Sequence, residues 1–501
     1  MKYFIPAWYQ QNKWWQDRNG PFYMKEHKSD FDDMMSLMRM HIGNNAPFTL
    51  IQLSYHTAFQ LFLHRNELYE ASYYSVFDEI QKFPQSAPKA LDYRDFKWKK
   101  GTEFIYTLYI IKAVYNNETT NIYYNEDGYL AWMEQFVDKV KVSRFIFDNR
   151  GFLSSIILFK EGKKHSQLYI DIDGDVVLKE DLNTSRVTVC KYFEQYERTT
   201  YDSLLELIQE KLAQFIKTHA AHPVVAAYDK QHNDLIQNVI PEEQLTYSIF
   251  KQRNRAHQYS RLNYKYIVDV QSIETLLKSQ QVKNVLRITP FDTSKLPSIS
   301  SQFYVDFIGL YIDGMSEDKI IDVIERITPM LTSSKKFKLK LLTKHNNKSA
   351  RLHSIIKDIN EAFIEQNEDT EDMMEDELQN VEIIQFEMIT FEVDLIAVVS
   401  KLRIIIDLNE EPDLFLQIAG VSTGVPQINK VATDYVEHKQ NGYIIHQIDE
   451  LLDGLEYYLN HLKHWNLSLS YSFKLIDQYS SRNIIDKIDE FIEGGTYGKE
   501  I

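Results

Sequence analysis

The stretch that decides the fold is residues 419–445, which read AGVSTGVPQINKVATDYVEHKQNGYII. Gly424 ends an apolar helical pattern, and Pro426 opens a short run of the strand type. Asn441-Gly442 is a turn signal before the apolar residues 443–445, and a helical pattern over 448–459 follows. A helix, a short strand, another strand and a helix in this order predict parallel strands in an α/β domain.

The same alternation extends toward the N-terminus and predicts a C-terminal Rossmann-like α/β domain over 265–469. Its expected strands are residues 265–270, 285–288, 303–312, 338–342, 381–385 and 402–407, with helical patterns between them. Lysines alternate with apolar residues over 335–340, which is typical of an edge strand. The polar stretch 252–263 is the expected linker to a preceding domain.

The N-terminal part of the chain shows a second α/β alternation. Strands are expected over 2–5 and 48–53, and Ser29-Asp30 is the expected cap of a helix. The apolar face of that helix consists of Phe31, Met34, Met35 and Met38. We expect an N-terminal Rossmann-like domain that is discontinuous in sequence, built from residues 1–101 and 196–264 and joined by a closing helix at 470–493.

Residues 102–195 have a different pattern and are predicted to form a β-sheet inserted into the first domain. Three turn tetrads interrupt runs rich in Tyr, Phe, Ile and Val, and each begins with Asn or Asp and ends with Gly: residues 125–128, 148–151 and 171–174. Asn, Asp and Gly tolerate the positive φ angles that hairpin turns require. The tetrads are 23 residues apart, which indicates two-stranded units repeated as an antiparallel meander.

Composition excludes several classes of function. The formal charge is −16, from 56 basic and 72 acidic residues, so the chain would repel a phosphate backbone and we expect no nucleic-acid partner. Only 16 residues are glycine, and the P-loop, the Gly-x-Gly-x-x-Gly fingerprint, the Gly-x-Ser-x-Gly elbow and the His-Glu-x-x-His zinc helix are all missing. A single cysteine, Cys190, favours a reducing cytoplasm. We find no signal peptide and no apolar run of membrane-spanning length.

One cluster could bind a metal ion. Asp171, Asp173 and Asp175 are alternate carboxylates, which could bind a hard cation such as Ca²⁺. A calcium loop has its turn glycine at position six and a bidentate Glu at position twelve, whereas here Gly174 is at position four and Leu182 at position twelve. The cluster therefore favours a hairpin turn over a metal site, and we predict neither a metal site nor a cofactor.

The quoted stretch resembles the donor half of two-domain, GT-B glycosyltransferases, in which a helix ends in Gly-x-Pro before a short strand. The resemblance assigns Lys319, Glu411, Gly424 and Pro426 as remnants of the donor site. It also shows two departures, because Ala419 stands where the second of two glutamates is expected and Gly314 where an arginine is expected. Each lost charge-assisted hydrogen bond costs roughly 1.5–3 kcal/mol, so two losses would weaken donor binding about a hundredfold to ten-thousandfold. The donor site is predicted to be degenerate, with no catalytic residues.

Motifs along the whole chain resemble the family of accessory secretory protein 1, a subunit of the accessory Sec system. They are residues 3–9 (YFIPAWY), 31–33, 76–81 (VFDEIQ), 147–155 (FDNRGFLSS), 406–408, 411–414 and 424–428. The resemblance implies a glycosyltransferase-like but non-catalytic subunit that helps to modify, escort and export serine-rich-repeat glycoprotein adhesins. It implies as partners the two companion accessory secretory proteins, the accessory SecA-type ATPase and the glycosylated adhesin. The implied location is the cytoplasm, with peripheral association at the inner face of the membrane left open.

Two alternatives remain from the residues themselves. The first is an active GT-B transferase acting on a serine-rich adhesin, with Glu411 and Lys319 in its donor site. The second is an unrelated interaction protein whose β-sheet insertion binds calcium through the Asp171 cluster.

Overall fold

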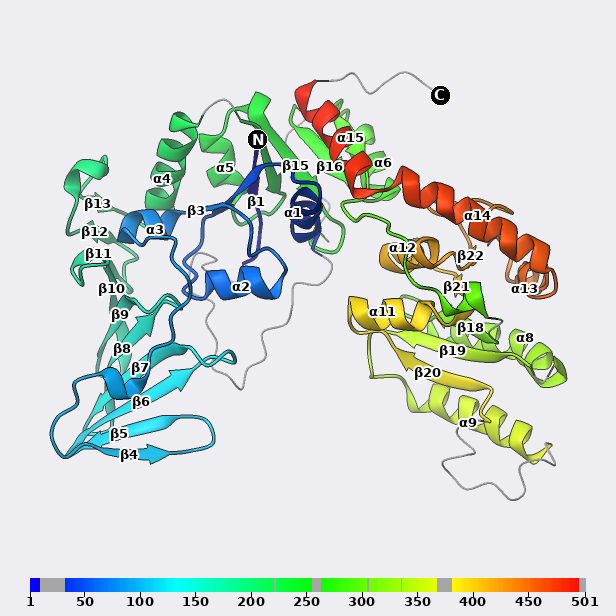
Figure 1. The fold of residues 1–501 in the computed structure, drawn as a ribbon, viewed down its shortest axis with the longest axis horizontal. Helices are drawn as coiled ribbons and strands as arrows, with labels where there is room; N and C mark the ends of the chain where they lie inside the picture. Colours follow the sequence, from blue (N-terminus) through cyan, green and yellow to red (C-terminus); the bar gives the residue numbers. More distant parts are fainter. Residues whose placement is uncertain are drawn as a thin grey trace. The chain divides into compact units, whose positions relative to one another are not determined.

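The computed structural model describes residues 1–9, 32–219, 222–254, 263–303, 306–334, 336–366 and 381–494 (Figure 1). The chain forms two compact units. The first unit comprises Met1–Pro290 and Ile485–Ile501, and the second comprises Phe291–Ile484. The mixed α/β fold class predicted from the sequence is confirmed, because each unit contains a parallel sheet.

The first unit is built around a parallel sheet of seven strands in the order β17-β16-β15-β14-β1-β2-β3. The order reverses between β1 and β14, as in the doubly wound Rossmann arrangement. These strands are β1 (Lys2–Ile5), β2 (Phe48–Gln52), β3 (Tyr73–Ser75), β14 (Val224–Ala227), β15 (Leu245–Ile249), β16 (Lys265–Val268) and β17 (Val285–Arg287). The helices between them are α1 (Asp33–Gly43), α2 (Phe59–Arg65), α3 (Val76–Gln81), α4 (Leu204–Thr218), α5 (Asn233–Val239) and α6 (Gln271–Ser279).

The boundary expected at residue 265 is corrected by this sheet. β16 pairs in parallel with β15, and β17 pairs in parallel with β16, so both strands belong to the first unit. The chain passes to the second unit only after Pro290. The expected linker falls largely on residues 255–262, which lie outside the described residues.

Helix α1 begins at Asp33, and its cap is Asp32, two residues after the expected Ser29-Asp30 cap. The Asp32 carboxylate caps it by accepting a hydrogen bond from Met35 N at 2.9 Å. The expected face is confirmed for Met34, Met35 and Met38, which are buried. Ser29, Asp30 and Phe31 lie outside the described residues.

Residues between α3 and α4 form an antiparallel sheet of ten strands in sequential order, β4 to β13 (Figure 1). Its strands are β4 (Glu103–Tyr106), β5 (Ile111–Tyr115), β6 (Glu118–Tyr124), β7 (Leu130–Val137), β8 (Val140–Phe147), β9 (Leu153–Lys160), β10 (Lys163–Ile170), β11 (Val176–Asp181), β12 (Val187–Val189) and β13 (Thr200–Tyr201). All three predicted tetrads are hairpin turns, in which Gly128, Gly151 and Gly174 have φ angles of 81°, 87° and 90°. The predicted meander is confirmed.

The second unit contains a parallel sheet of six strands in the order β20-β19-β18-β21-β22-β23. Numbered along the chain, this is the 3-2-1-4-5-6 order of a Rossmann sheet, with the reversal between β18 and β21. The strands are β18 (Phe307–Tyr311), β19 (Lys338–Thr343), β20 (Ile384–Met388), β21 (Leu402–Asp407), β22 (Gln427–Asn429) and β23 (Gly442–Ile444). Its helices are α7 (Ile299–Gln302), α8 (Glu317–Ser334), α9 (Ala350–Glu365), α11 (Glu392–Val399), α12 (Leu414–Thr423), α13 (Leu451–Leu459) and α14 (Leu462–Gln478).

The prediction of an edge strand at the lysine-rich run is wrong. β19 pairs with β18 on one side and with β20 on the other. Lys340 Nζ lies 2.9 Å from Gln385 Oε1 and 3.0 Å from Glu387 Oε2, both on β20. The lysine that suggested an exposed edge therefore forms a cross-strand ion pair.

The expected closing helix at 470–493 is divided into the end of α14 and α15 (Ser481–Glu493). The residues from Ile485 onward belong to the first unit. There Asp489 pairs with Lys2 of β1, and the C=O of Ile492 accepts a hydrogen bond from Lys265 of β16. Within the described residues, no helix is both long enough and apolar enough to cross a membrane.

Candidate functional site

The point of strand reversal in the second sheet is where a Rossmann-like unit binds its ligand. Asp313 and Gly314 follow β18 there. On the other side of the reversal, Asp407 is the last residue of β21 and Asn409 lies two residues beyond it. Asn409 Nδ2 donates to the C=O of Asp313 at 3.0 Å and to Asp407 Oδ1 at 2.8 Å. The Asn409 side chain therefore connects the two strand ends across the position that a ligand would approach.

Gly314 occupies the position where the resemblance places an arginine. Its φ angle is 85°, a conformation that side-chain-bearing residues rarely adopt. A Cβ atom at this position would lie 2.8 Å from Oδ1 of Asn409. The backbone and Asn409 together exclude an arginine here without rearrangement.

Lys344 and Lys348, in the loop after β19, both contact carboxylates of the chain itself. Lys344 Nζ lies 2.7 Å from Asp413 Oδ2, and Lys348 Nζ lies 2.7 Å from Asp313 Oδ1. Burial opposes ionisation of Asp313, but hydrogen bonds from Lys344 N, Lys348 and Thr343 hold its pKa below the usual value. A diphosphate would have to displace these carboxylates to reach either ammonium group.

The buried carboxyl of Asp407 organises the loop between β21 and α12. It accepts hydrogen bonds from Asn409 N at 3.1 Å and from Asp413 N at 2.7 Å. Burial raises the pKa of Asp407 to about 6 despite these bonds. Asp413 in turn caps α12, because its Oδ1 accepts a hydrogen bond from Leu416 N at 3.0 Å. These carboxyls hold the loop in place.

A pocket of about 580 Å³ opens beside this network, between the ends of β18 and β19 and the first turns of α8 and α9. Its polar lining includes Asp313, Glu317, His345 and Lys348. The only lysine of that lining is paired with Asp313 at 2.7 Å. The pocket therefore has two carboxylates at its wall and is poorly suited to a nucleoside diphosphate.

The structure places the predicted donor-site remnants at different parts of this end of the second unit. Lys319 is exposed in the first turn of α8 and helps to lower the pKa of Glu410, whose main partner is Lys430. Glu411 is half-buried just before α12, and Ala419 is buried within that helix. Pro426 is buried, and its C=O accepts a hydrogen bond from Ile405 N at 3.0 Å.

Gly424 has a structural role at the end of α12. It is the C-cap residue, with a φ angle of 74°, and its N–H donates to the C=O of Val421 at 3.1 Å. A Cβ atom here would lie 2.1 Å from Cδ1 of Leu469 on α14. The left-handed backbone and the Leu469 side chain therefore both favour glycine here, whether or not a ligand binds.

Gly424→Ala is expected to destabilise the protein by about 1–2 kcal/mol, because the residue must keep a left-handed conformation. The cost should be smaller in a Leu469→Ala background, where the contact with Cδ1 is removed. Urea denaturation of the wild type, Gly424→Ala, Leu469→Ala and the double variant measures both free-energy changes. Gly43→Ala is the control, since nothing lies within 4 Å of its added Cβ; an equal loss there would contradict the explanation.

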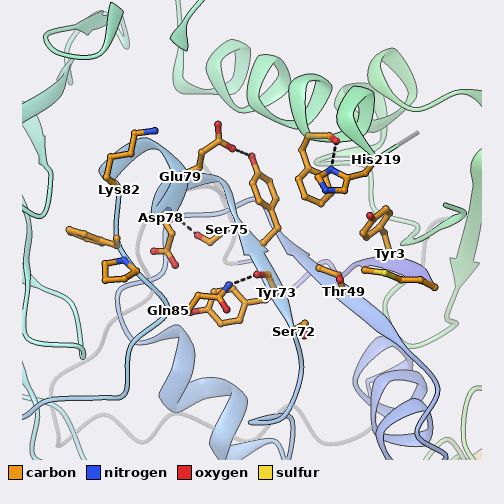
Figure 2. A pocket seen from close by; sticks show the side chains of 15 residues that line it. Tyr3, Thr49, Ser72, Tyr73, Ser75, Asp78, Glu79, Lys82, Gln85 and His219 are labelled. Carbon is orange, nitrogen blue, oxygen red and sulfur yellow. Dashed lines mark hydrogen bonds between the residues drawn. The ribbon is translucent and has the colours of Figure 1, made fainter. Parts of the chain in front are cut away.

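The first unit contains a second pocket, of about 650 Å³, over β1, β2 and β3 (Figure 2). Asp78, Glu79, Lys82 and Gln85 surround it. Asp78 is bound by Arg150, Glu79 by Tyr74, Lys82 by Gln195, and Gln85 by the C=O of Tyr73. The charged groups of this pocket already have partners within the chain, so we assign it no chemistry.

The Asp171 cluster is a hairpin turn between β10 and β11. Asp171 Oδ1 accepts hydrogen bonds from Asp173 N at 3.0 Å and from Asp175 N at 2.8 Å. Lys191 Nζ lies 2.6 Å from Asp171 Oδ2 and 2.9 Å from Asp175 Oδ2. An ammonium group therefore occupies the place that a cation would take. Among the described residues, no three metal-ligating side chains lie together.

Sequence reasoning missed the buried polar groups at the strand reversal of the first sheet. Arg253 Nη2 lies 2.9 Å from Asp33 Oδ2, and Asp33 is fully buried. Tyr9 OH lies 2.7 Å from His232 Nδ1, while His232 Nε2 lies 2.7 Å from the C=O of Ala227. Burial lowers the pKa of His232 to about 4, so the ring is neutral at pH 7. Several of these polar residues follow the ends of predicted strands, which indicates a candidate site. The sequence spacing alone, however, cannot show that Asp33 and Arg253, which are 220 residues apart, form a pair.

Comparison with solved structures defines the class of the protein. The pneumococcal O-GlcNAc transferase GtfA, solved in complex with UDP and GlcNAc, has a TM-score of 0.61 and covers 99% of each chain at 12% identity. The fold and the two Rossmann-like sheets are those of a GT-B glycosyltransferase-like protein. A family model described as accessory Sec system protein, accessory secretory protein 1, matches residues 1–495. The chain belongs to this family.

Relatives of the same family cover nearly the whole chain. The accessory Sec system protein of Staphylococcus aureus is 44% identical over 513 residues, and that of Streptococcus gordonii is 30% identical over 521 residues. They cover 99% and 98% of this chain, and 99% of each relative is covered. A chain of the glycosylation-associated Gap123 complex from Streptococcus agalactiae is 29% identical, with a TM-score of 0.72 over 98% of this chain and all of that chain. A chain of the Streptococcus pneumoniae complex of accessory secretory proteins 1, 2 and 3 is 25% identical, with a TM-score of 0.71 over all of both chains.

Proposed function

We propose that this protein is a non-catalytic assembly subunit of the accessory Sec system, built on a glycosyltransferase fold whose donor site is degenerate. The observation that carries the proposal is the internal network at the strand reversal of the second sheet. Asn409 connects the two strand ends and lies against Gly314, which has no side chain to offer a cation. Lys344 and Lys348 bind Asp413 and Asp313. The groups that would bind a sugar nucleotide instead stabilise the fold.

The proposed partners are first of all the two companion accessory secretory proteins. Related chains were solved in the Gap123 complex and in the complex of accessory secretory proteins 1, 2 and 3. Family membership further supports the accessory SecA-type ATPase and the glycosylated serine-rich-repeat adhesin as partners. We place the chain in the cytoplasm, where it would meet the adhesin before export.

Isothermal titration calorimetry with UDP-GlcNAc, UDP-glucose and GDP-glucose tests the proposal. We expect no binding tighter than about 1 mM, because Lys344 and Lys348 are paired with Asp413 and Asp313 and so are not available to the diphosphate. Micromolar affinity for any of these donors would contradict the proposal. In that case transfer of radiolabelled sugar to a serine-rich acceptor, abolished by Glu411→Ala and retained by Glu410→Ala, would establish the alternative of an active transferase.

A further inference from the structure

The outermost strand of the antiparallel sheet, β4, has an open edge (Figure 1). At the β4–β5 hairpin Thr107 N donates to the C=O of Ile110 at 3.0 Å, and hydrogen-bonded pairs recur at every second residue of an antiparallel ladder. The bonded pairs are therefore Ile105 with Lys112 and Glu103 with Val114. The N–H and C=O groups of Phe104 and Tyr106 point away from β5, and no hydrogen bond from the described residues reaches them.

Exposed apolar side chains accompany this edge. Ile105, Tyr106, Leu108 and Tyr109 are between 49% and 85% exposed. Contiguous exposed apolar side chains of this size mark interaction surfaces in soluble proteins. Sheet edges are normally protected by charged residues, above all lysine, or by proline within the strand; in β4 the only charged residue is Glu103 at its start, and residues 104–106 carry no such protection. The opposite edge, β13, has only two residues and leads directly into α4.

The segment between Asp95 and Glu103, the first residue of β4, has a charge opposite to that of the whole protein. Residues 96–102 carry three lysines and no carboxylate, whereas the chain has a net charge of −16. Lys99 pairs with Glu118 at 2.7 Å, but Lys97 and Lys100 are exposed and form no ion pair with any described residue. This positive segment directly precedes β4. It favours a partner with carboxylates, and it disfavours a second copy of the same chain, which would bring an equally positive segment.

We infer that β4 accepts an extended strand of a companion accessory secretory protein, with alternating apolar residues and with Asp or Glu beside Lys97 and Lys100. The partner strand would pair with the N–H and C=O groups of Phe104 and Tyr106 and so extend the sheet by one strand. Its alternating apolar residues would lie beside Ile105 on one face of the sheet, and its carboxylates would neutralise the two lysines. This inference rests on the proposed function, because it names the surface by which the assembly subunit binds a companion.

The test is co-expression of the full chain with the two companion accessory secretory proteins, followed by co-purification and affinity measurement. Tyr106→Pro removes the N–H that points to the open edge, and Tyr106→Ala is the matched control, which loses the same side chain but keeps that donor. We expect companion binding to be at least about tenfold weaker in the proline variant than in the alanine variant. The double variant Lys97→Glu/Lys100→Glu should weaken companion binding without changing the hydrogen-bonding groups of β4. Because salt screens exposed charges, this loss of affinity should be larger at low salt.

Two further measurements separate the outcomes. In the complex, hydrogen exchange at the amides of Phe104 and Tyr106 should become slower than in the free chain. If the wild-type chain recovers no companion, the proposed function fails and this inference fails with it. If the wild type and all variants bind equally, or if the two amides exchange unchanged, only the inference is overturned. If sedimentation shows that the free chain dimerises and that Tyr106→Pro abolishes the dimer, the occupant is a second copy and the inference is also overturned.

Discussion

Replacing Arg150 with alanine is expected to lower the stability of the first unit by about 3–5 kcal/mol. Arg150 lies in the β8–β9 turn and is almost completely buried. Its Nη2 donates to Asp78 Oδ1 at 2.7 Å, and its Nε donates to Asp148 Oδ1 at 2.7 Å. Burial disfavours the charge, but bonds to Asp148 and Asp78 raise the pKa of Arg150 above its ordinary value. Without the guanidinium, the buried Asp148 and the half-buried Asp78 would lose the cation between them, and among the described residues Asp148 would keep only the hydrogen bond from the backbone N–H of residue 150.

The loss of stability should extend beyond one contact, because Arg150 connects two parts of the first unit. These are helix α3, which follows β3 of the parallel sheet, and the β8–β9 turn of the antiparallel sheet. Asp78 belongs to α3, and Arg150 Nη1 also donates to the C=O of Pro84 at 3.1 Å. Hydrogen exchange of β8 and β9 under increasing urea measures the effect. Arg94→Ala is the control, since Arg94 pairs with Asp92 at an exposed site where such pairs contribute about 0–1 kcal/mol. Unchanged protection in Arg150→Ala would show that the two carboxyls are accommodated without their cation.

The parts of the fold that could be predicted from the sequence are those fixed by local chemistry. An Asn or Asp followed three residues later by Gly determines a hairpin turn within one segment, and Asn125, Asp148 and Asp171 each begin such a turn. Likewise, the apolar face of α1 follows from helical spacing. These features depend on neighbours in the chain, so no knowledge of the tertiary fold was needed.

The assignment of strands to sheets could not be predicted in the same way. Residues 265–268 and 285–287 are strands as expected, but periodicity does not show which sheet a parallel strand joins. Lys340 shows the same limit, because its pairing with Glu387 depends on β20 lying next to β19. Strand neighbours follow from the tertiary topology, and a single sequence gives no direct evidence of it.

The donor-site region was predicted only in part. The positions of Gly314 and Ala419 suggested missing groups, but the sequence did not show what replaces them. Asn409 and Gly314 are separated by nearly a hundred residues, and the strand reversal brings them into contact. The lysine–carboxylate pairs of this site also join residues from different loops, Lys344 with Asp413 and Lys348 with Asp313. Whether a lysine is available to a ligand depends on these pairs, so the composition of a loop alone does not decide it.

Asp269→Asn is expected to stabilise the protein at pH 8 and to have much less effect at pH 5. Asp269 lies just after β16 in the first unit, and burial raises its pKa to about 7. Its carboxyl accepts a hydrogen bond from Lys251 N at 3.1 Å, which an asparagine oxygen can also accept. Because the unfolded carboxyl has a pKa of about 3.9, the folded state binds more protons between about pH 4 and pH 7. Wild-type stability therefore falls as pH rises through this range.

The asparagine variant carries no such penalty, so its advantage over the wild type should increase by about 2–3 kcal/mol between pH 5 and pH 8 and then level off. Urea denaturation of both proteins across this range measures the difference. Asp358→Asn removes the same charge from an exposed position on α9 and should show no comparable dependence on pH. A constant difference between Asp269→Asn and the wild type would mean that the Asp269 carboxyl is ionised in the folded protein throughout the range. In that case Arg253, the nearby cation of the same buried cluster, would have to compensate the cost of burial.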